Sequence, residues 1–212
     1  MVEKLFWQDP YLTRLEARVV GVDGDAITLD RTIYFAQSGG QESDRGSIGG
    51  HRVLAAQKQG PEIVYALEDR HGLKPGDCVL IEIDWPRRYR LMRLHFACEL
   101  LLELIYRAVP GIEKIGAHIA EEKARIDFLH EESLAGLLPD LLEQLNAITE
   151  QDLQIVSDFS DRNQERRFWA IEGFAQVPCG GTHLRSTGEI GNLSLKRKNP
   201  GQGKERVEIR LA

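Results

Sequence analysis

The chain contains few cysteines and no long apolar segment. Its 212 residues include only three cysteines, Cys78, Cys98 and Cys179, none of them in a Cys-x-x-Cys pair. Such a small, odd number excludes a disulfide framework and favours free thiols, so we expect a cytoplasmic protein. No apolar run approaches the roughly 20 residues of a membrane span, and the first twelve residues lack the pattern of a secretory signal. We therefore expect no membrane association.

The chain also lacks an overall excess of basic residues. Lys and Arg number 27 against 33 Asp and Glu, a net charge of −6, which excludes a uniformly basic nucleic-acid coat. Two stretches are nevertheless positive, residues 87–112 at +3 and residues 173–212 at +4. They can meet a phosphate backbone if folding brings them to one face. Scattered, solvated charge is the alternative.

The first 86 residues have the pattern of a β-rich domain. Apolar and polar residues alternate over 15–22 and 26–30, and Asp23-Gly24-Asp25 between them is typical of a hairpin turn. Further strands are expected over 32–35, 52–55, 62–67 and 78–83. Short strands separated by turn signals favour a small barrel or a sandwich.

From Arg87 the pattern changes to mixed helix and strand. Apolar residues recur every three or four positions up to Ala108, which predicts an amphipathic helix, and a second helix is expected over 131–150. Strands are expected over 116–120, 124–128, 153–157, 168–171, 191–196 and 207–211. Because helices and strands do not alternate regularly, the sequence predicts an α+β fold.

Two short motifs carry side chains that bind metals. His95 and Glu99 lie four apart in the first helix and so share one face. Cys179-Gly-Gly-Thr-His183 places a thiol and an imidazole four apart on an expected loop, since Pro178 favours an extended or turn conformation.

Imidazole, thiolate and carboxylate together suit Zn²⁺. The alternative is a purely structural role for each residue. His95 would then be hydrogen-bonded to Glu99, Cys179 would be a buried thiol, and His183 would be an ordinary turn residue. Spacing alone does not decide between a zinc site and these ordinary structural roles.

Two glycine-rich stretches remain. Residues 37–46 follow an expected strand and residues 199–203 form an expected hairpin loop flanked by lysine and arginine. Neither matches a Walker loop or a dinucleotide-binding fingerprint, so no ATP or dinucleotide cofactor is expected. A plain turn is the simpler reading of residues 37–46, and a phosphate contact is an alternative for residues 199–203.

Taken in order, these segments resemble the AlaX-type freestanding alanyl-tRNA editing proteins, relatives of the editing domain of alanyl-tRNA synthetase. The resemblance covers most of the chain. It is carried by the glycine-rich segment 34–46, the helix segment 90–99, the strand segments 116–119 and 123–128, the Cys179–His183 motif and the segment 187–191. It implies a small N-terminal β-barrel domain over 1–86. A two-layer α/β editing domain with a mainly antiparallel sheet then follows over 87–212.

The resemblance also implies an activity. It is hydrolysis, in trans, of the ester that joins serine or glycine wrongly to the 3′ end of tRNA(Ala). One Zn²⁺ per chain would be held by His95, Glu99, Cys179 and His183, with His95 and Glu99 as catalytic residues. The expected tRNA contacts are Arg87, Arg88, Arg90, Arg93, Lys196, Arg197 and Lys198. The acceptor end or substrate is expected at Gly39, Gly40, Gln41, Asp44 and Thr182.

One position departs from the family pattern. The first metal motif of the family ends in histidine, and here that residue is Glu99. Glu99 can ligate zinc, can act as a general base beside a three-ligand site, or can mark lost activity. Zinc can activate water and the ester carbonyl, or hold the amino group of the substrate. Editing of another mischarged tRNA and an inactive tRNA-binding homologue are the alternatives, and the sequence does not predict the oligomeric state.

Overall fold

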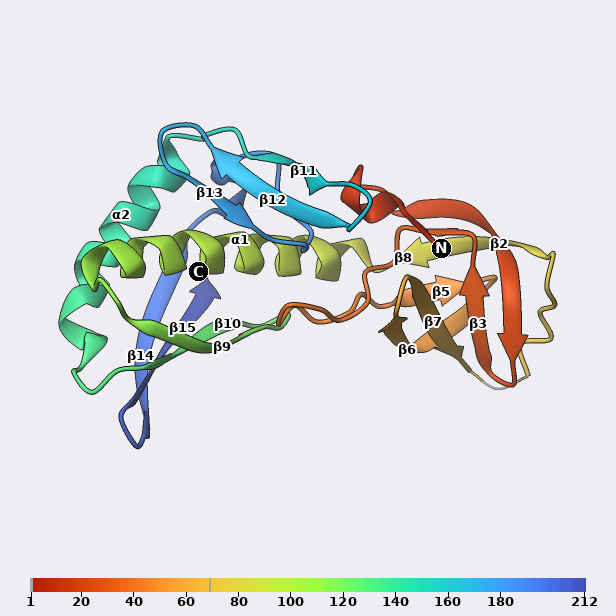
Figure 1. The fold of residues 1–212 in the computed structure, drawn as a ribbon, viewed down its shortest axis with the longest axis horizontal. Coiled ribbons are helices and arrows are strands. Elements are labelled where there is room, and N and C mark those ends of the chain that lie inside the picture. The colour runs from red at the N-terminus through yellow and green to blue at the C-terminus, as the bar shows by residue number, and fades with distance from the viewer. Residues whose placement is uncertain (1, 69) are drawn as a thin grey trace. The chain divides into compact units, whose positions relative to one another are not determined.

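The structure is a computed structural model that describes residues 2–68 and 70–212. It confirms an α+β chain with mainly antiparallel strands and few helices (Figure 1). The chain divides into two compact units, one of residues 1–38 and 42–89, the other of residues 39–41 and 90–212. No helix of the described residues is both long and apolar enough to cross a bilayer.

The first unit is built from strands that pair in a closed ring. The ring order is β2, β3, β7, β6, β5, β8, and β8 pairs again with β2, every pair being antiparallel. A short parallel pair, β1 with β4, lies outside the ring. The elements are β1 (Glu3–Lys4), η1 (Leu5–Trp7), β2 (Arg14–Asp23), β3 (Ala26–Leu29), β4 (Arg31–Thr32), β5 (Gly46–Ile48), β6 (His51–Gln59), β7 (Glu62–Leu67) and β8 (Cys78–Ile83).

The expected hairpin between β2 and β3 is confirmed. Gly24 has a φ of 58°, the left-handed conformation that the tight turn requires. Val19, Ile27 and Leu29 point inward from this hairpin and are at most 1% exposed. The alternating pattern therefore placed both turn and core face correctly.

The strand expected over 32–35 is mostly absent, because β4 ends at Thr32. Here, side-chain oxygens accept the backbone N–H groups that would otherwise pair with a neighbouring strand. The Tyr34 amide donates to Thr32 Oγ1 at 3.0 Å, and the Phe35 amide donates to Asp44 Oδ2 at 2.7 Å. These bonds satisfy the buried backbone without a neighbouring strand.

The second unit contains most of the long helix α1 and two sheets. Strands β14, β15, β10 and β9 form one antiparallel sheet in that order, and β11, β12 and β13 form the other. The elements are α1 (Trp85–Ala108), β9 (Glu113–Ile119), β10 (Ala124–Leu129), η2 (Leu134–Leu137), α2 (Leu138–Glu150), β11 (Val156–Asp161), β12 (Arg166–Ile171), β13 (Ala175–Pro178), η3 (Thr187–Ile190), β14 (Leu193–Gly201) and β15 (Lys204–Leu211).

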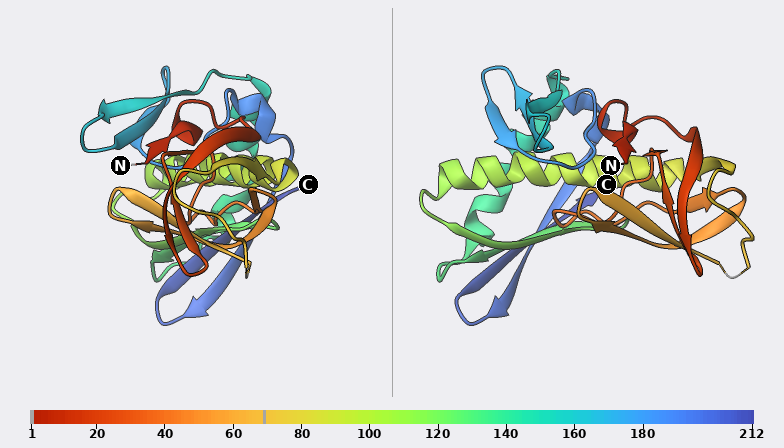
Figure 2. Two further views of the ribbon diagram at one scale, coloured as in Figure 1. Left: turned by 90° about the vertical axis from the view of Figure 1, so that its right-hand side faces the viewer. Right: turned by 45° about the vertical axis from the view of Figure 1, so that its right-hand side comes forward.

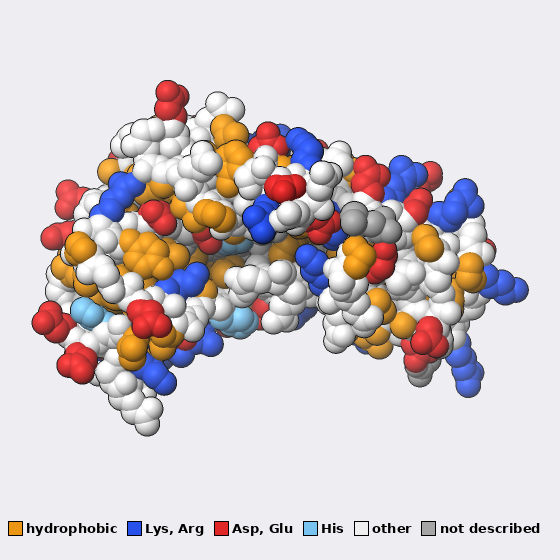
Figure 3. Space-filling model, in the orientation of Figure 1, with side chains coloured by type: hydrophobic (Ala, Val, Ile, Leu, Met, Phe, Trp, Pro, Cys, Tyr) orange, Lys and Arg blue, Asp and Glu red, His pale blue; other side chains and the backbone are white. Residues whose placement is uncertain are grey.

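Helix α1 has strands on two sides within this unit, so the expected two layers become three (Figures 1 and 2). Its residues are buried on more than one stripe: Leu91, Met92, Leu94, Phe96 and Ala97 are each 0% exposed. A helix buried all round lies between layers rather than against one. The space-filling view shows that charged side chains of both signs share the outer surface with apolar ones (Figure 3).

The second helix starts later than expected. Residues 134–137 form a 3₁₀ turn, and α2 begins only at Leu138. The Ser133 hydroxyl accepts the Ala135 amide at 3.3 Å and so fixes the 3₁₀ turn first. Pro139 then occupies the first turn of α2, where its missing N–H has no cost.

Candidate metal centre

His95 lies near the middle of α1 and is 3% exposed. Its Nδ1 is 2.7 Å from Gln41 Oε1, an oxygen that also accepts the Thr182 amide at 3.3 Å. Residues 39–41 run beside the end of β9, where the Ile119 amide donates to the Gly40 carbonyl at 2.8 Å. Because Nδ1 donates to Gln41, Nε2 is the ring nitrogen directed into the centre.

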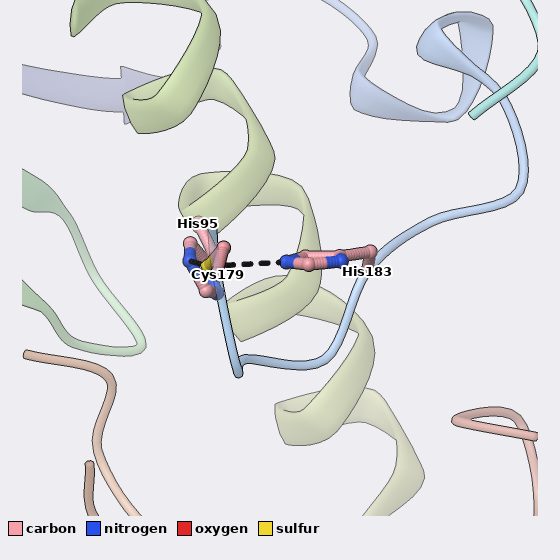
Figure 4. Close-up of side chains that lie close together, drawn as sticks. All are labelled: His95, Cys179 and His183. Atoms are coloured by element: carbon pink, nitrogen blue, oxygen red, sulfur yellow. Dashed lines mark hydrogen bonds between the residues drawn. The ribbon is translucent and has the colours of Figure 1, made fainter. Parts of the chain in front are cut away.

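Cys179 and His183 come from the loop that follows β13. The Cys179 amide donates to the Arg167 carbonyl at 3.0 Å, which continues the pairing of β13 with β12. Cys179 Sγ lies 3.4 Å from His95 Nε2 and 3.3 Å from His183 Nε2 (Figure 4). On its other side, His183 Nδ1 lies 2.8 Å from Ser157 Oγ.

The loop can approach the helix this closely because residue 181 is glycine. A Cβ built on Gly181 would overlap the imidazole of His95. Gly180 has open space at the same position, so only one of the two glycines is demanded by packing. Within Cys179-Gly-Gly-Thr-His183, Gly181 is therefore the residue that lets the two motifs meet.

The pKa values of the two histidines are shifted in opposite directions. Burial opposes a charge on His95, but its contacts with Cys179 and Glu99 raise its pKa to about 10. Burial, with the positive charges of His95 and Arg167, holds the pKa of His183 well below its usual value. The side chains that contact His95 thus favour a positive charge at the centre.

Glu99 lies beside this centre but outside its donor group. Its Oε1 is 3.4 Å from His95 Nε2, and its Oε2 accepts the indole N–H of Trp169 at 2.9 Å. Burial alone would raise the pKa of Glu99, but the hydrogen bonds from His95 and Trp169 lower it to about 2. The carboxylate is therefore ionised and held by an aromatic donor.

The donor set fits a borderline divalent cation. One atom each from His95, Cys179 and His183 lie within 4.8 Å of one another, and Glu99 does not join that group. Two imidazole nitrogens and a thiolate are ligands that suit Zn²⁺, and three protein ligands with an open fourth position are typical of catalytic zinc. A cation there would replace the charge that the His95 proton now provides.

Three residues expected to contact tRNA or its acceptor end, Arg87, Arg88 and Asp44, are buried. Arg88 is 0% exposed: its Nε donates to Asp44 Oδ1 at 2.7 Å and its Nη2 to Asp44 Oδ2 and the Ile33 carbonyl. Asp44 is 3% exposed. Arg87 is 4% exposed and donates to Glu42 Oε2 at 2.6 Å. All three side chains are engaged inside the first unit rather than at its surface.

The other predicted tRNA contacts are at least partly accessible. Arg90 is exposed, and Arg93 is half-buried with its Nε on the Ile190 carbonyl at 2.9 Å. Lys196 and Lys198 are exposed on β14, whereas Arg197 between them pairs with Glu205. Neighbouring residues of a strand face opposite ways, so the run is not one patch.

Only some of the expected substrate contacts lie beside the candidate centre. Gln41 and Thr182 are buried, and Gln41 Nε2 donates to Thr182 Oγ1 at 2.9 Å. Gly39 is exposed, and Gly40, with a φ of 90°, lies against the Ala117 carbonyl. Gln41 thus contacts a metal-ligand candidate, a role that the sequence did not predict.

The contacts of Ser157 and Trp169 with the site were also missed. Each lies on a strand of the three-stranded sheet, far in sequence from its partner. Serine and tryptophan in strands are ordinary, so no local pattern marks them. Only strand register brings Ser157 opposite Trp169 and both beside the centre.

Known proteins match this chain over its full length. An "Alanyl-tRNA editing protein AlaX-M" of Pyrococcus horikoshii is 34% identical, covering 100% of this chain and 98% of that protein. The protein of the same name from Saccharolobus solfataricus is 32% identical, covering 98% of each. The chain belongs to the AlaX-M family of alanyl-tRNA editing proteins.

Two further matches agree with this family. The family model described as "Threonyl and Alanyl tRNA synthetase second additional domain" matches residues 167–208, which include Cys179 and His183. An "Alanine--tRNA ligase" of Ignicoccus hospitalis is 34% identical over 91% of this chain, which spans 24% of that ligase. AlaX-M proteins thus share this sequence region with a much longer enzyme.

Proposed function

We propose that this protein is a zinc-dependent aminoacyl-tRNA deacylase that clears Ser-tRNA(Ala) or Gly-tRNA(Ala) in trans. The observation that carries the proposal is the convergence of His95, Cys179 and His183 within 4.8 Å, in a chain that AlaX-M proteins match from end to end. That convergence speaks against the alternative of a decayed site. We assign hydrolysis to residues 87–212, the predicted editing domain, together with Gly39–Gln41 of the glycine-rich segment, which belong to the same compact unit as residues 90–212.

Each side chain of the centre has a distinct part in this proposal. His95 Nε2, Cys179 Sγ and His183 Nε2 would hold one zinc ion per chain. Bound zinc supplies a Lewis acid for the ester carbonyl or for water, or an anchor for the free amino group of the substrate. Gln41 and Ser157 orient the two imidazoles through their Nδ1 atoms.

Glu99 is proposed as the proton acceptor rather than a fourth ligand. It lies outside the donor group, and Oε1 is directed at His95 Nε2. Burial would raise the pKa of Glu99, but the hydrogen bond with His95, more than any other contact, lowers it to about 2. When Nε2 engages another partner, the Oε1 lone pairs that face it become available to accept a proton.

Metal content and deacylation together test this function. Purified protein should contain about one zinc and should hydrolyse Ser-tRNA(Ala) or Gly-tRNA(Ala) faster than Ala-tRNA(Ala). Cys179→Ala should lose zinc and activity, while Cys78→Ala, which removes an exposed thiol of the first unit, should keep both. A Cys179→Ala variant or a chelated sample that works at the native rate would refute the zinc mechanism. Hydrolysis of other mischarged tRNAs only would refute the substrate assignment.

A further inference from the structure

The outer face of the four-stranded sheet carries a concentration of positive charge. On β15, Val207 and Ile209 point inward and are 0% exposed, so alternate residues point outward. The outward side chains on β14, β10 and β15, together with the residue just before β10, define the basic sheet face. Its cations are Lys123, Arg125, Lys196, Lys198, Lys204, Arg206 and Arg210.

Two carboxylates hold four of these cations in place. Glu208, 3% exposed, accepts Lys123 Nζ at 2.6 Å and lies 3.9 Å from Lys198 Nζ. Asp127 accepts Arg206 Nε at 2.5 Å and is also paired with Arg125. Each carboxylate therefore fixes two cationic heads, which lowers the entropy lost when they bind a partner.

The positive charge of this face is opposite in sign to the net charge of the whole chain. Seven cations lie with these two carboxylates, in a chain whose net charge is −6. Such segregation produces a local positive field that attracts polyanions. Pairing within the sheet needs only as many cations as carboxylates, so sheet stability does not explain the excess.

The face has the length and position to follow a nucleic-acid backbone. From Arg210 to Lys204, β15 spans about 20 Å at about 3.3 Å per residue. That length allows the cations of the face to contact several phosphates of one strand at once. The Arg210 end lies near the pairing of Ala124 with Ile119, whose amide donates to the Gly40 carbonyl beside Gln41. One end of the face thus lies beside segment 39–41, whose Gln41 contacts His95.

We propose that the basic sheet face binds the sugar-phosphate backbone of the tRNA acceptor arm and guides its 3′ end toward the centre. This inference rests on the proposed function for the identity of the RNA. In this proposal the basic sheet face contacts the phosphates instead of the buried Arg87 and Arg88, and Lys196 and Lys198 remain phosphate contacts as the sequence predicted. The contacts are to phosphates, so they provide affinity and orientation without reading base sequence.

Binding of uncharged tRNA(Ala) by fluorescence anisotropy across a salt series tests the proposal. The triple variant Lys196→Gln, Lys198→Gln, Arg210→Gln should raise Kd at least tenfold at low salt. Its slope of log K against log salt should fall by about 2 to 3, since each phosphate contact contributes about 0.7 to 0.9. The matched control Arg31→Gln, Arg52→Gln, Lys74→Gln removes the same charge from exposed positions of the first unit and should bind like the wild type.

The outcomes separate the possible failures. Wild-type affinity and slope in the triple variant, or an equal loss in the control, would overturn the sheet-face proposal. If the triple variant melts early, single Lys196→Gln and Arg210→Gln variants replace it, and each should reduce the slope by about 1. A wild-type protein that binds tRNA through this face yet hydrolyses no mischarged tRNA would overturn the proposed function alone. Hydrolysis with an unaffected triple variant would overturn this inference alone.

Discussion

Ser157 Oγ lies 2.8 Å from Nδ1 of His183 and leaves Nε2 of that ring facing Cys179. A partner on the second ring nitrogen fixes the tautomer and the orientation of a ligating histidine. The three-stranded sheet therefore contributes to the candidate metal centre through a residue that is not itself a ligand candidate.

We expect Ser157→Ala to weaken zinc binding by about 10- to 100-fold, because the His183 ring loses its hydrogen-bond partner. Competition with a chelating dye measures this change without relying on activity. Ser160→Ala on the same strand is the matched control, since its hydroxyl donates to the Arg166 carbonyl instead. Equal zinc affinity in the two variants would show that Ser157 does not orient the ligand.

Gly181 and Gly180 form a second matched pair. Gly181→Ala should abolish zinc binding, because its Cβ must displace the His95 imidazole, whereas Gly180→Ala meets no atom within 4 Å. Zinc content after purification and a thermal melt measure the two effects. A Gly181→Ala protein that retains full zinc would show that the loop does not pack against His95 as described.

Glu99→Gln should retain zinc and lose deacylation. The amide oxygen can still accept the Trp169 indole N–H, but a neutral amide cannot take a proton. Loss of a general base lowers kcat by about 10²- to 10⁴-fold. Single-turnover hydrolysis and metal analysis of one preparation separate the roles. A drop in zinc affinity equal to that of Cys179→Ala would make Glu99 a ligand, and Glu99→His should then restore binding and activity.

Local patterns predicted the elements that local forces decide. The β2–β3 hairpin follows from alternation and Gly24, and the pairing of β9 with β10 follows from two adjacent apolar strands. The strand expected at 32–35 failed because Asp44, nine residues beyond Phe35, takes the Phe35 amide. A bond between residues so far apart leaves no periodic trace in the sequence.

The candidate metal centre was predictable only in part, for the same reason. The four-residue spacings marked His95, Cys179 and His183 as candidate ligands, because spacing limits which side chains share a helix face or a tight loop. The sequence shows the cation of Arg88 but not that it is buried against the carboxylate of Asp44. The opposite facing of Lys196 and Arg197, by contrast, follows from the strand that was expected there.

The buried pair of Arg88 and Asp44 should stabilise the first unit. Asp44→Ala leaves the guanidinium buried without its carboxylate and should lower the free energy of unfolding by about 3 to 5 kcal/mol. Arg90→Ala, on an exposed neighbour, should change it by about 0.5 kcal/mol or less. Urea unfolding followed by tryptophan fluorescence compares the variants. Equal midpoints would show that the pair contributes nothing.

Glu205 should make the second unit sensitive to acid. Its carboxylate accepts Arg197 Nε at 2.7 Å and the Leu134 amide at 3.1 Å, and the bond from Arg197 foremost lowers its pKa. A depressed pKa stabilises the folded chain above the unfolded value of about 4.3. That stability is lost as pH falls from this value through the folded pKa.

Glu205→Gln should therefore lower the free energy of unfolding by about 2 kcal/mol at pH 7, the order expected for a charged hydrogen bond. The difference from the wild type should shrink as the pH is lowered from 5 to 3, because the wild-type carboxyl is then protonated too. Denaturant midpoints at each pH measure it, with Glu172→Gln at an exposed site as the control. A difference that stays constant from pH 7 to pH 3 would mean that the Glu205 charge does not stabilise the fold, and that its packing alone does.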